Sequence, residues 1–214
     1  MEEYLRSTDI IDSDSPKIKR KAIDLTSQID TDTEKAKALF YFVRDRIKYR
    51  IAVFQVMEKE IFRASFTLKR SYGFCITKSI LLIALLRAID IPARLCFADI
   101  RNHLMTDNFR KFSGTDIMAF HGYAELFING LWIKVNSAFD IDLCRENKFI
   151  PVDFSGDKDA LAPPFDLKGR PHFEYVKNRG SFADLPYDTL LSGLVEFYGH
   201  RDEQQMAEWN QGYY

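Results

Sequence analysis

Three residues along the chain have the types and order needed for thiol chemistry. Cys75 follows Gly73-Phe74 at the expected start of a helix, where unpaired N–H groups and the helix dipole favour its thiolate. The N–H of Cys75 could also donate to an oxyanion. His121 opens a strand-like run and is the candidate base, and Asn136 closes the next strand, where its amide could orient the imidazole. This order predicts a triad of Cys75 as nucleophile, His121 as base and Asn136 as orienter.

Each of these residues also has a plainer interpretation. A lone cysteine is more often a small buried hydrophobe, and a lone histidine is more often a structural side chain. The prediction therefore depends on the combination. Asp140 competes with Asn136 for the role of orienter, in a less predictable position four residues on. Lys78, one turn into the helix that Cys75 starts, would either add positive potential there or extend into solvent.

Other candidate ligands along the chain are expected to be inert. Cys96 lies inside a strand-like run, and Cys144 lies in an irregular stretch with no helix start to activate it. The three cysteines fit neither C-x-x-C zinc spacing nor a disulfide framework. Asp153, Ser155, Asp157 and Asp159 crowd around a glycine, but their spacing is not that of a calcium loop. We expect a solvated turn there, with no metal and no other cofactor.

Helices are expected in the first half of the chain. One begins at Ser15-Pro16, and a second has the capping-box pattern Thr31-x-x-Glu34 with an apolar stripe. A third runs from Cys75 to about Ala88, and its segment Ile80–Leu86 is apolar on every side. An all-apolar helix is buried, so Cys75 is expected at the start of a central helix.

Strands are expected to follow the buried helix. A strand at 93–100 and a polar connection at 101–114 precede a hairpin, whose runs 121–128 and 131–135 flank Asn129-Gly130. The Pro-, Gly- and Asp-rich stretch from 140 to 186 predicts long covering loops, and a last helix is expected at about 188–198. This order predicts an α+β fold with helices packed on an antiparallel sheet.

Composition limits the organisation and the partners of the protein. The 214 residues, 46% hydrophobic, suit a single domain over 1–214, with its core at about 31–140, covering loops and a helix at 141–198, and a polar tail at 199–214. Thirty basic and 31 acidic side chains give no attraction for nucleic acid or anionic lipid. No signal peptide and no apolar run of about 20 residues is visible, so no membrane contact is expected. The cysteine pattern favours a reducing, cytoplasmic setting.

Several sequence segments carry a family resemblance. Gly73-Phe-Cys75, Leu85-Leu-Arg-Ala-Ile-Asp-Ile-Pro-Ala-Arg94, His121-Gly-Tyr-Ala-Glu125 and Asn129-Gly-Leu-Trp132 together resemble the core of the transglutaminase-like superfamily. Segments 153–160, 164–169, 174–175 and 180–186 are similar to an uncharacterised, largely bacterial subgroup. The sequence departs from the family pattern at Asn136, where Asp is typical, and at Tyr123, where Trp is usual.

The resemblance implies a papain-like fold and acyl chemistry on a peptide, protein or small amide. Cys75 would attack the carbonyl carbon, His121 would give a proton to the leaving amine, and the thioester would be resolved by water or by an amine. We favour the hydrolase over the acyl transferase, because water needs no dedicated acceptor site. The alternative is a non-catalytic module that keeps the fold to bind a protein or peptide partner, which the asparagine at 136 would allow.

Overall fold

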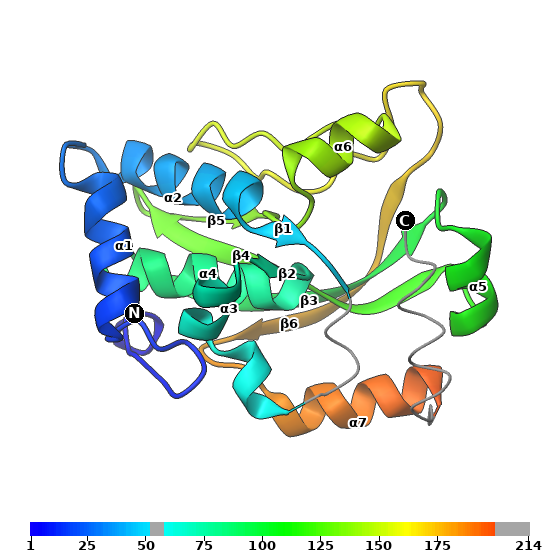
Figure 1. The fold of residues 1–214 in the computed structure, drawn as a ribbon, viewed down its shortest axis with the longest axis horizontal. Helices are drawn as coiled ribbons and strands as arrows, with labels where there is room; N and C mark the ends of the chain where they lie inside the picture. Colours follow the sequence, from blue (N-terminus) through cyan, green and yellow to red (C-terminus); the bar gives the residue numbers. More distant parts are fainter. Residues whose placement is uncertain (52–57, 200–214) are drawn as a thin grey trace.

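The computed structural model describes residues 1–51 and 58–199 (Figure 1). Its helices are α1 (Pro16–Thr26), α2 (Asp32–Arg46), α3 (Ala64–Arg70), α4 (Cys75–Arg87), α5 (Asp107–Ser113), α6 (Ile141–Asn147) and α7 (Tyr187–Tyr198), with 3-10 turns at Glu2–Tyr4 and Lys59–Phe62. Its strands are β1 (Lys48–Tyr49), β2 (Tyr72–Gly73), β3 (Ala93–Asn102), β4 (Ile117–Ile128), β5 (Leu131–Val135) and β6 (Phe173–Phe182). The predicted α+β fold, with helices packed on an antiparallel sheet, is confirmed.

Four strands form the main sheet, in the order β5-β4-β3-β6, and all of their pairings are antiparallel. The predicted hairpin joins β4 to β5, with Ile128 paired to Leu131. Asn129 and Gly130 both have positive φ, at 53° and 81°, as a two-residue type I′ turn requires. This turn fixes the register, so that Val135 pairs with Ala124 and Asn136 follows just beyond the pairing.

The central helix α4 is buried along its whole length, from Cys75 to Arg87. It contacts β3 and β4 on one side and α1, α2 and α3 on the other, and Figure 1 shows it in the middle of the molecule. This burial explains why Ile80–Leu86 is apolar all round, because every face of that segment meets protein. The sequence prediction of a buried helix that begins at Cys75 is confirmed.

The flanking helices follow their sequence signals in part. Thr31 caps α2 through its hydroxyl, which accepts from the N–H of Glu34 at 3.3 Å. In α1, Ile18 and Ala22 are buried at the predicted helical spacing. Ser15 stands at the N-cap of α1, so the predicted start at Ser15-Pro16 is confirmed, although the Ser15 side chain makes no capping hydrogen bond. The longest described helix, α2, has 15 residues, and none of the described helices is long and apolar enough to cross a bilayer.

The stretch predicted as covering loops contains regular structure. It holds α6 and the edge strand β6, which pairs along β3. The polar connection at 101–114 likewise holds α5, and β4 starts at Ile117, so His121 lies within a strand instead of opening it. β6 escaped prediction because it is an edge strand with two register shifts, and its mostly exposed residues show no apolar alternation. From residue 200 on, the predicted polar tail lies outside the described residues.

Candidate functional site

Cys75 is the first residue of α4 and is 7% exposed. The first turn is closed by Thr77, whose hydroxyl accepts from the N–H of Phe74 at 3.1 Å. Gly73 makes room for this arrangement, since a Cβ at that position would lie 2.4 Å from the Thr77 hydroxyl oxygen. The sequence Gly-Phe-Cys-x-Thr therefore places the cysteine side chain at the N-terminus of the helix.

The start of α4 is packed directly against the backbone of β4. At Gly122, the residue after His121, a Cβ would lie 2.9 Å from the Cα of Ile76. The Ser79 hydroxyl is within hydrogen-bonding distance of two carbonyl oxygens, at 2.8 Å from that of Cys75 and 3.2 Å from that of Gly122. The N–H of Gly122 also acts on the Cys75 thiol, where it lowers the pKa against the larger effect of burial. Cys75 in α4 and His121 in β4 therefore come from two elements whose backbones pack together at the residues that follow them.

His121 lies at an irregular point of β4, next to a register shift against β3. The preceding residue, Phe120, has a left-handed backbone with φ of 55°, and its N–H donates to the carboxylate of Asp99 at 3.1 Å. One residue earlier, the N–H of Ala119 donates to the Tyr198 hydroxyl of α7 at 2.7 Å. These two side chains satisfy backbone groups that the irregular pairing leaves open, and so they hold the strand in shape just before His121.

Asn136 contacts the imidazole of His121. Its Nδ2 lies 2.9 Å from His121 Nε2 and 3.3 Å from the hydroxyl oxygen of Tyr175, while its Oδ1 accepts from the N–H of Ala138 at 3.0 Å. Among the described residues, the other ring nitrogen, Nδ1 of His121, is buried and has no hydrogen-bond partner. The imidazole is thus held at one nitrogen and unpartnered at the other.

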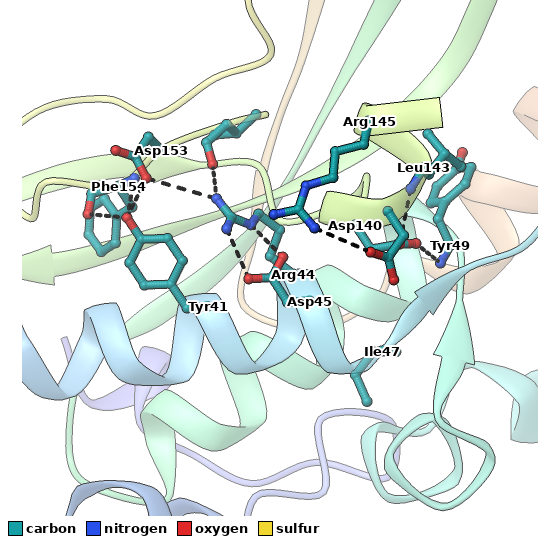
Figure 2. Close-up of polar contacts among 12 residues, drawn as sticks. Tyr41, Arg44, Asp45, Ile47, Tyr49, Asp140, Leu143, Arg145, Asp153 and Phe154 are labelled. Carbon is teal, nitrogen blue, oxygen red and sulfur yellow. Dashed lines mark hydrogen bonds and ion pairs between the residues drawn. The ribbon is translucent and has the colours of Figure 1, made fainter. Parts of the chain in front are cut away.

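Asp140, the competing candidate, is engaged elsewhere, as Figure 2 shows. Its carboxylate caps α6 through the N–H of Leu143 and accepts from the N–H of Tyr49 at 2.8 Å. Burial acts to raise the pKa of Asp140, but these two N–H groups and the nearby Lys78 and Lys48 outweigh it and hold the pKa below its usual value. The structure brings Asn136 to His121 and uses Asp140 to join β1 to α6.

Burial sets the charge state of the candidate pair. It raises the pKa of the Cys75 thiol to about 11, although the N–H groups of Gly122, Ile76 and Cys75 itself act in the opposite direction. Burial also lowers the pKa of His121 to about 4. The N–H groups at the helix start favour the thiolate, as expected, but loss of hydration in this buried site disfavours both charges more strongly. At neutral pH a neutral thiol lies near a neutral imidazole.

Lys78 is fully buried, so its expected extension into solvent is wrong. Its ammonium nitrogen donates to the carbonyl oxygens of Arg44 and Ile47, at 3.1 and 2.6 Å, where α2 ends. Burial lowers the pKa of Lys78 to about 7, against the effect of nearby carboxylates such as Asp140. The side chain ties the first turn of α4 to the end of α2 by satisfying carbonyl groups that a helix end leaves open.

Among the described residues, the other sequence candidates make no hydrogen bond to Cys75, His121 or Asn136. Cys96 and Cys144 are buried, and burial raises the pKa of both thiols, that of Cys144 to about 12. All three cysteines are free. In the 153–159 turn, Asp153 accepts from the Tyr41 hydroxyl (Figure 2). Asp159 accepts from the N–H of Lys134, so both carboxylates serve the fold. The described part of the chain contains no group of three or more His, Cys, Asp or Glu side chains placed to hold a metal.

Three residues near the site escaped sequence reasoning. Tyr175 meets Asn136 from β6, Asp99 holds the backbone before His121 from β3, and Tyr198 does the same from α7. Only Tyr175 fell in a segment noted for family resemblance. No local pattern marks such residues, because their roles depend on pairing between segments that are far apart in the chain.

Comparison of the sequence with known families places this chain in a known class. Residues 19–137 match the sequence profile of the transglutaminase-like superfamily, which is more than half of the chain, so the chain belongs to that superfamily. The matched region includes all three predicted site residues. The comparison with curated proteins finds no match.

Two solved structures are similar to this chain. One is a "putative cysteine protease" from Cytophaga hutchinsonii, at 21% identity over 84% of this chain and 52% of that chain, with a TM-score of 0.49. The other is a "putative protease" from Parabacteroides distasonis, at 16% identity over 57% of this chain and 23% of that chain, with a TM-score of 0.40. The matched region spans about half of the first structure and about a quarter of the second.

Proposed function

We propose that this protein is a thiol-dependent enzyme that breaks an amide or peptide bond through an acyl intermediate on Cys75. The unpartnered Nδ1 of His121 carries this proposal. Because Asn136 occupies Nε2, Nδ1 is the imidazole nitrogen left to exchange a proton with a thiol. The thiol in question is at the start of α4, which touches β4 at the residue after His121.

The first chemical step would be attack of the Cys75 sulfur on the carbonyl carbon. The thiol proton passes to Nδ1 of His121, and a carbon–sulfur bond forms as the carbonyl oxygen becomes an oxyanion. The N–H groups in the first turn of α4 are the candidate donors to that oxyanion. Collapse of the tetrahedral intermediate breaks the carbon–nitrogen bond, and the amine leaves with the proton from Nδ1.

Resolution of the thioester decides between hydrolysis and transfer. His121 takes a proton from the incoming water or amine, and the Cys75 thiol is restored when the acyl group leaves. We favour water, because an amine acceptor would need a binding site of its own. The substrate class is a peptide, a protein or a small amide, and no cofactor enters any step. The buried, free state of all three cysteines suits a reducing, cytoplasmic setting.

Activity-based profiling tests this proposal. The wild type and Cys75→Ala are incubated with panels of glutamine, peptide and acyl-amine probes, and Cys144→Ala serves as a matched control that removes an equally buried thiol. We expect acylation and turnover in the wild type and in Cys144→Ala, and neither in Cys75→Ala. Equal labelling of Cys75→Ala would disprove the role of Cys75.

A second candidate function is a non-catalytic module that binds a protein or peptide. The specific observation in its favour is that burial holds both Cys75 and His121 neutral, so no thiolate–imidazolium pair stands ready. The two candidates differ in whether Cys75 is ever acylated. The module would be supported if the wild type and Cys75→Ala bind a peptide with equal affinity and the wild type forms no thioester with any probe.

A further inference from the structure

The orientation of the Asn136 side chain follows from its surroundings. An N–H group donates only to an acceptor, so the amide atom that receives the N–H of Ala138 at 3.0 Å has to be Oδ1. This contact is an Asx turn, formed with the residue two positions on, and it belongs to the local backbone. Nδ2 then faces His121 Nε2 at 2.9 Å and the Tyr175 hydroxyl oxygen at 3.3 Å.

Each hydrogen of the Asn136 amide has a partner in this orientation. One hydrogen of Nδ2 is directed to Nε2 of His121 and the other to the hydroxyl oxygen of Tyr175. The reversed amide would bring Nδ2 against the buried N–H of Ala138 and leave both donors without an acceptor. The observed orientation therefore satisfies the residue and the reversed one does not.

This orientation fixes the proton on the imidazole. A neutral imidazole carries its single proton on one nitrogen, and a nitrogen that accepts from an amide N–H carries none. We infer that Asn136 is a positioning residue that holds resting His121 in the Nδ1–H form, which is the wrong form for taking a proton from Cys75. The activity part of this inference rests on the proposed function, while the proton position does not.

Asn136 thereby acts as a brake on the site, because it keeps His121 from taking the Cys75 proton. For Nδ1 to act as a base, the ring proton has to move to Nε2, and Asn136 has to turn its Oδ1 toward it and give up the Ala138 contact. An aspartate at 136 would remove the conflict, because one carboxylate oxygen could accept from Ala138 while the other accepts from Nε2–H. Asn136→Asp is therefore expected to make Cys75 more reactive.

Other titratable groups around His121 do not replace Asn136 in this role. Tyr175 of β6 meets the ring edge-on, with centroids 6.3 Å apart, and Tyr198 of α7 bonds the backbone two residues upstream. Asp99 of β3 is committed to the Phe120 N–H and to Arg179. On the α4 side the nearby group is the Cys75 thiol itself.

Nitrogen-15 NMR of the histidine side chains tests the proton position directly in the 214-residue chain. At pH 7 we expect the His121 signals of the wild type to show a protonated Nδ1 and an unprotonated Nε2. A wild-type spectrum with the proton on Nε2, or on both nitrogens, would overturn the inference. This measurement involves no acyl chemistry, so its outcome is independent of whether Cys75 is an enzyme nucleophile.

Asn136→Asp tests the brake. A carboxylate beside an imidazole typically raises the pKa of the imidazole by about 1–3 units, and one of its oxygens would accept from Nε2–H. Nε2 should therefore become protonated, which leaves Nδ1 free to take the Cys75 proton. Cys75 alkylation at pH 7 should then rise about tenfold or more. Tyr123→Phe is the matched control, since Tyr123 packs on the same Tyr175 ring without bonding Asn136, and it should change neither readout. An Asn136→Asp protein that keeps an unprotonated Nε2 would contradict the inference. A protonated Nε2 with no gain in alkylation would refute the brake while leaving the proton position intact.

Discussion

The contact between Gly122 and the start of α4 predicts a large loss of stability for Gly122→Ala. A methyl group at 122 would lie 2.9 Å from Ile76 Cα and 3.2 Å from Ile76 N. Ordinary contact begins at 3.4 Å, so α4 and β4 have to separate by about 0.5 Å at this point. Because backbone atoms lie on both sides, no rotamer change relieves the clash, and we expect a loss near the upper end of the usual overpacking range, about 3 kcal/mol.

Urea unfolding followed by circular dichroism measures this loss. Gly114→Ala is the matched control, because it adds the same methyl group where nothing lies within 4 Å. Gly114 has φ of 71°, so its alanine variant should lose about 1 kcal/mol through backbone strain alone. A loss in Gly122→Ala no larger than that in Gly114→Ala would refute the close packing of α4 on β4.

The same variant should change the environment of Cys75. Separation of the two elements admits water to the thiol and weakens the effect of the Gly122 N–H on it. We therefore expect the rate of Cys75 alkylation by iodoacetamide to rise severalfold in Gly122→Ala and to stay at the wild-type value in Gly114→Ala. Stability lost as predicted with an unchanged alkylation rate would show that this contact does not control access to Cys75.

Three further predictions concern charge at and near the site. The pKa of the Cys75 thiol is raised to about 11 by burial, so its native-state alkylation rate should climb with pH up to that value; a plateau below pH 8.5 would contradict the burial argument. Burial lowers the pKa of Lys78 to about 7 from the much higher value of the unfolded chain, so above pH 7 the unfolded state keeps a Lys78 proton that the folded state has lost, and the contribution of Lys78 to the free energy of unfolding should rise from pH 7 to pH 10. The buried thiols, whose pKa is raised, act in the opposite direction above about pH 8.5, so the rise is measured as a widening gap between the wild type and Lys78→Met. Lys78→Met should lose this rise and leave two carbonyl groups unpaired at about 1–3 kcal/mol each, and an unchanged urea profile across that pH range would disprove the role of Lys78. Asp140→Ala should lower the free energy of unfolding by about 1–3 kcal/mol at pH 7. Because the folded pKa of Asp140 is lowered, the difference from the wild type should close as the pH falls below about 4. A difference that persists at low pH would count against the charged role of Asp140.

The parts of the fold that sequence predicted were those with a strong local signal. The apolar run from Ile80 to Leu86 indicates a helix with no exposed face, and Asn129-Gly130 requires a hairpin turn whatever surrounds it. Counting back along that hairpin also placed Asn136 near His121, because the turn sets the register. The strand β6 has no such signal, since pairing with β3 stabilises it and its residues are mostly exposed.

The charge state of the site could not be predicted from local sequence. A helix start favours the Cys75 thiolate, and that effect is the only one visible from the residues nearby. Burial has the larger effect on the thiol, and the surrounding protein comes from distant parts of the chain, including Tyr175 on β6 and Tyr198 on α7. The orientation of the Asn136 amide likewise depends on a contact between its side chain and the backbone of Ala138, which residue types alone do not reveal.

The most direct test of the proposed function is mass spectrometry of the acid-quenched protein during turnover of an amide substrate. We predict an acyl adduct on the peptide that contains Cys75, released by hydroxylamine as a thioester should be, and absent from Cys75→Ala and from His121→Ala. The same acid quench should leave Cys96 and Cys144 unmodified, because burial raises the pKa of both thiols and neither stands at the start of α4. An adduct that persists in Cys75→Ala, or that forms on Cys96 or Cys144 instead, would contradict the assignment of Cys75 as the nucleophile.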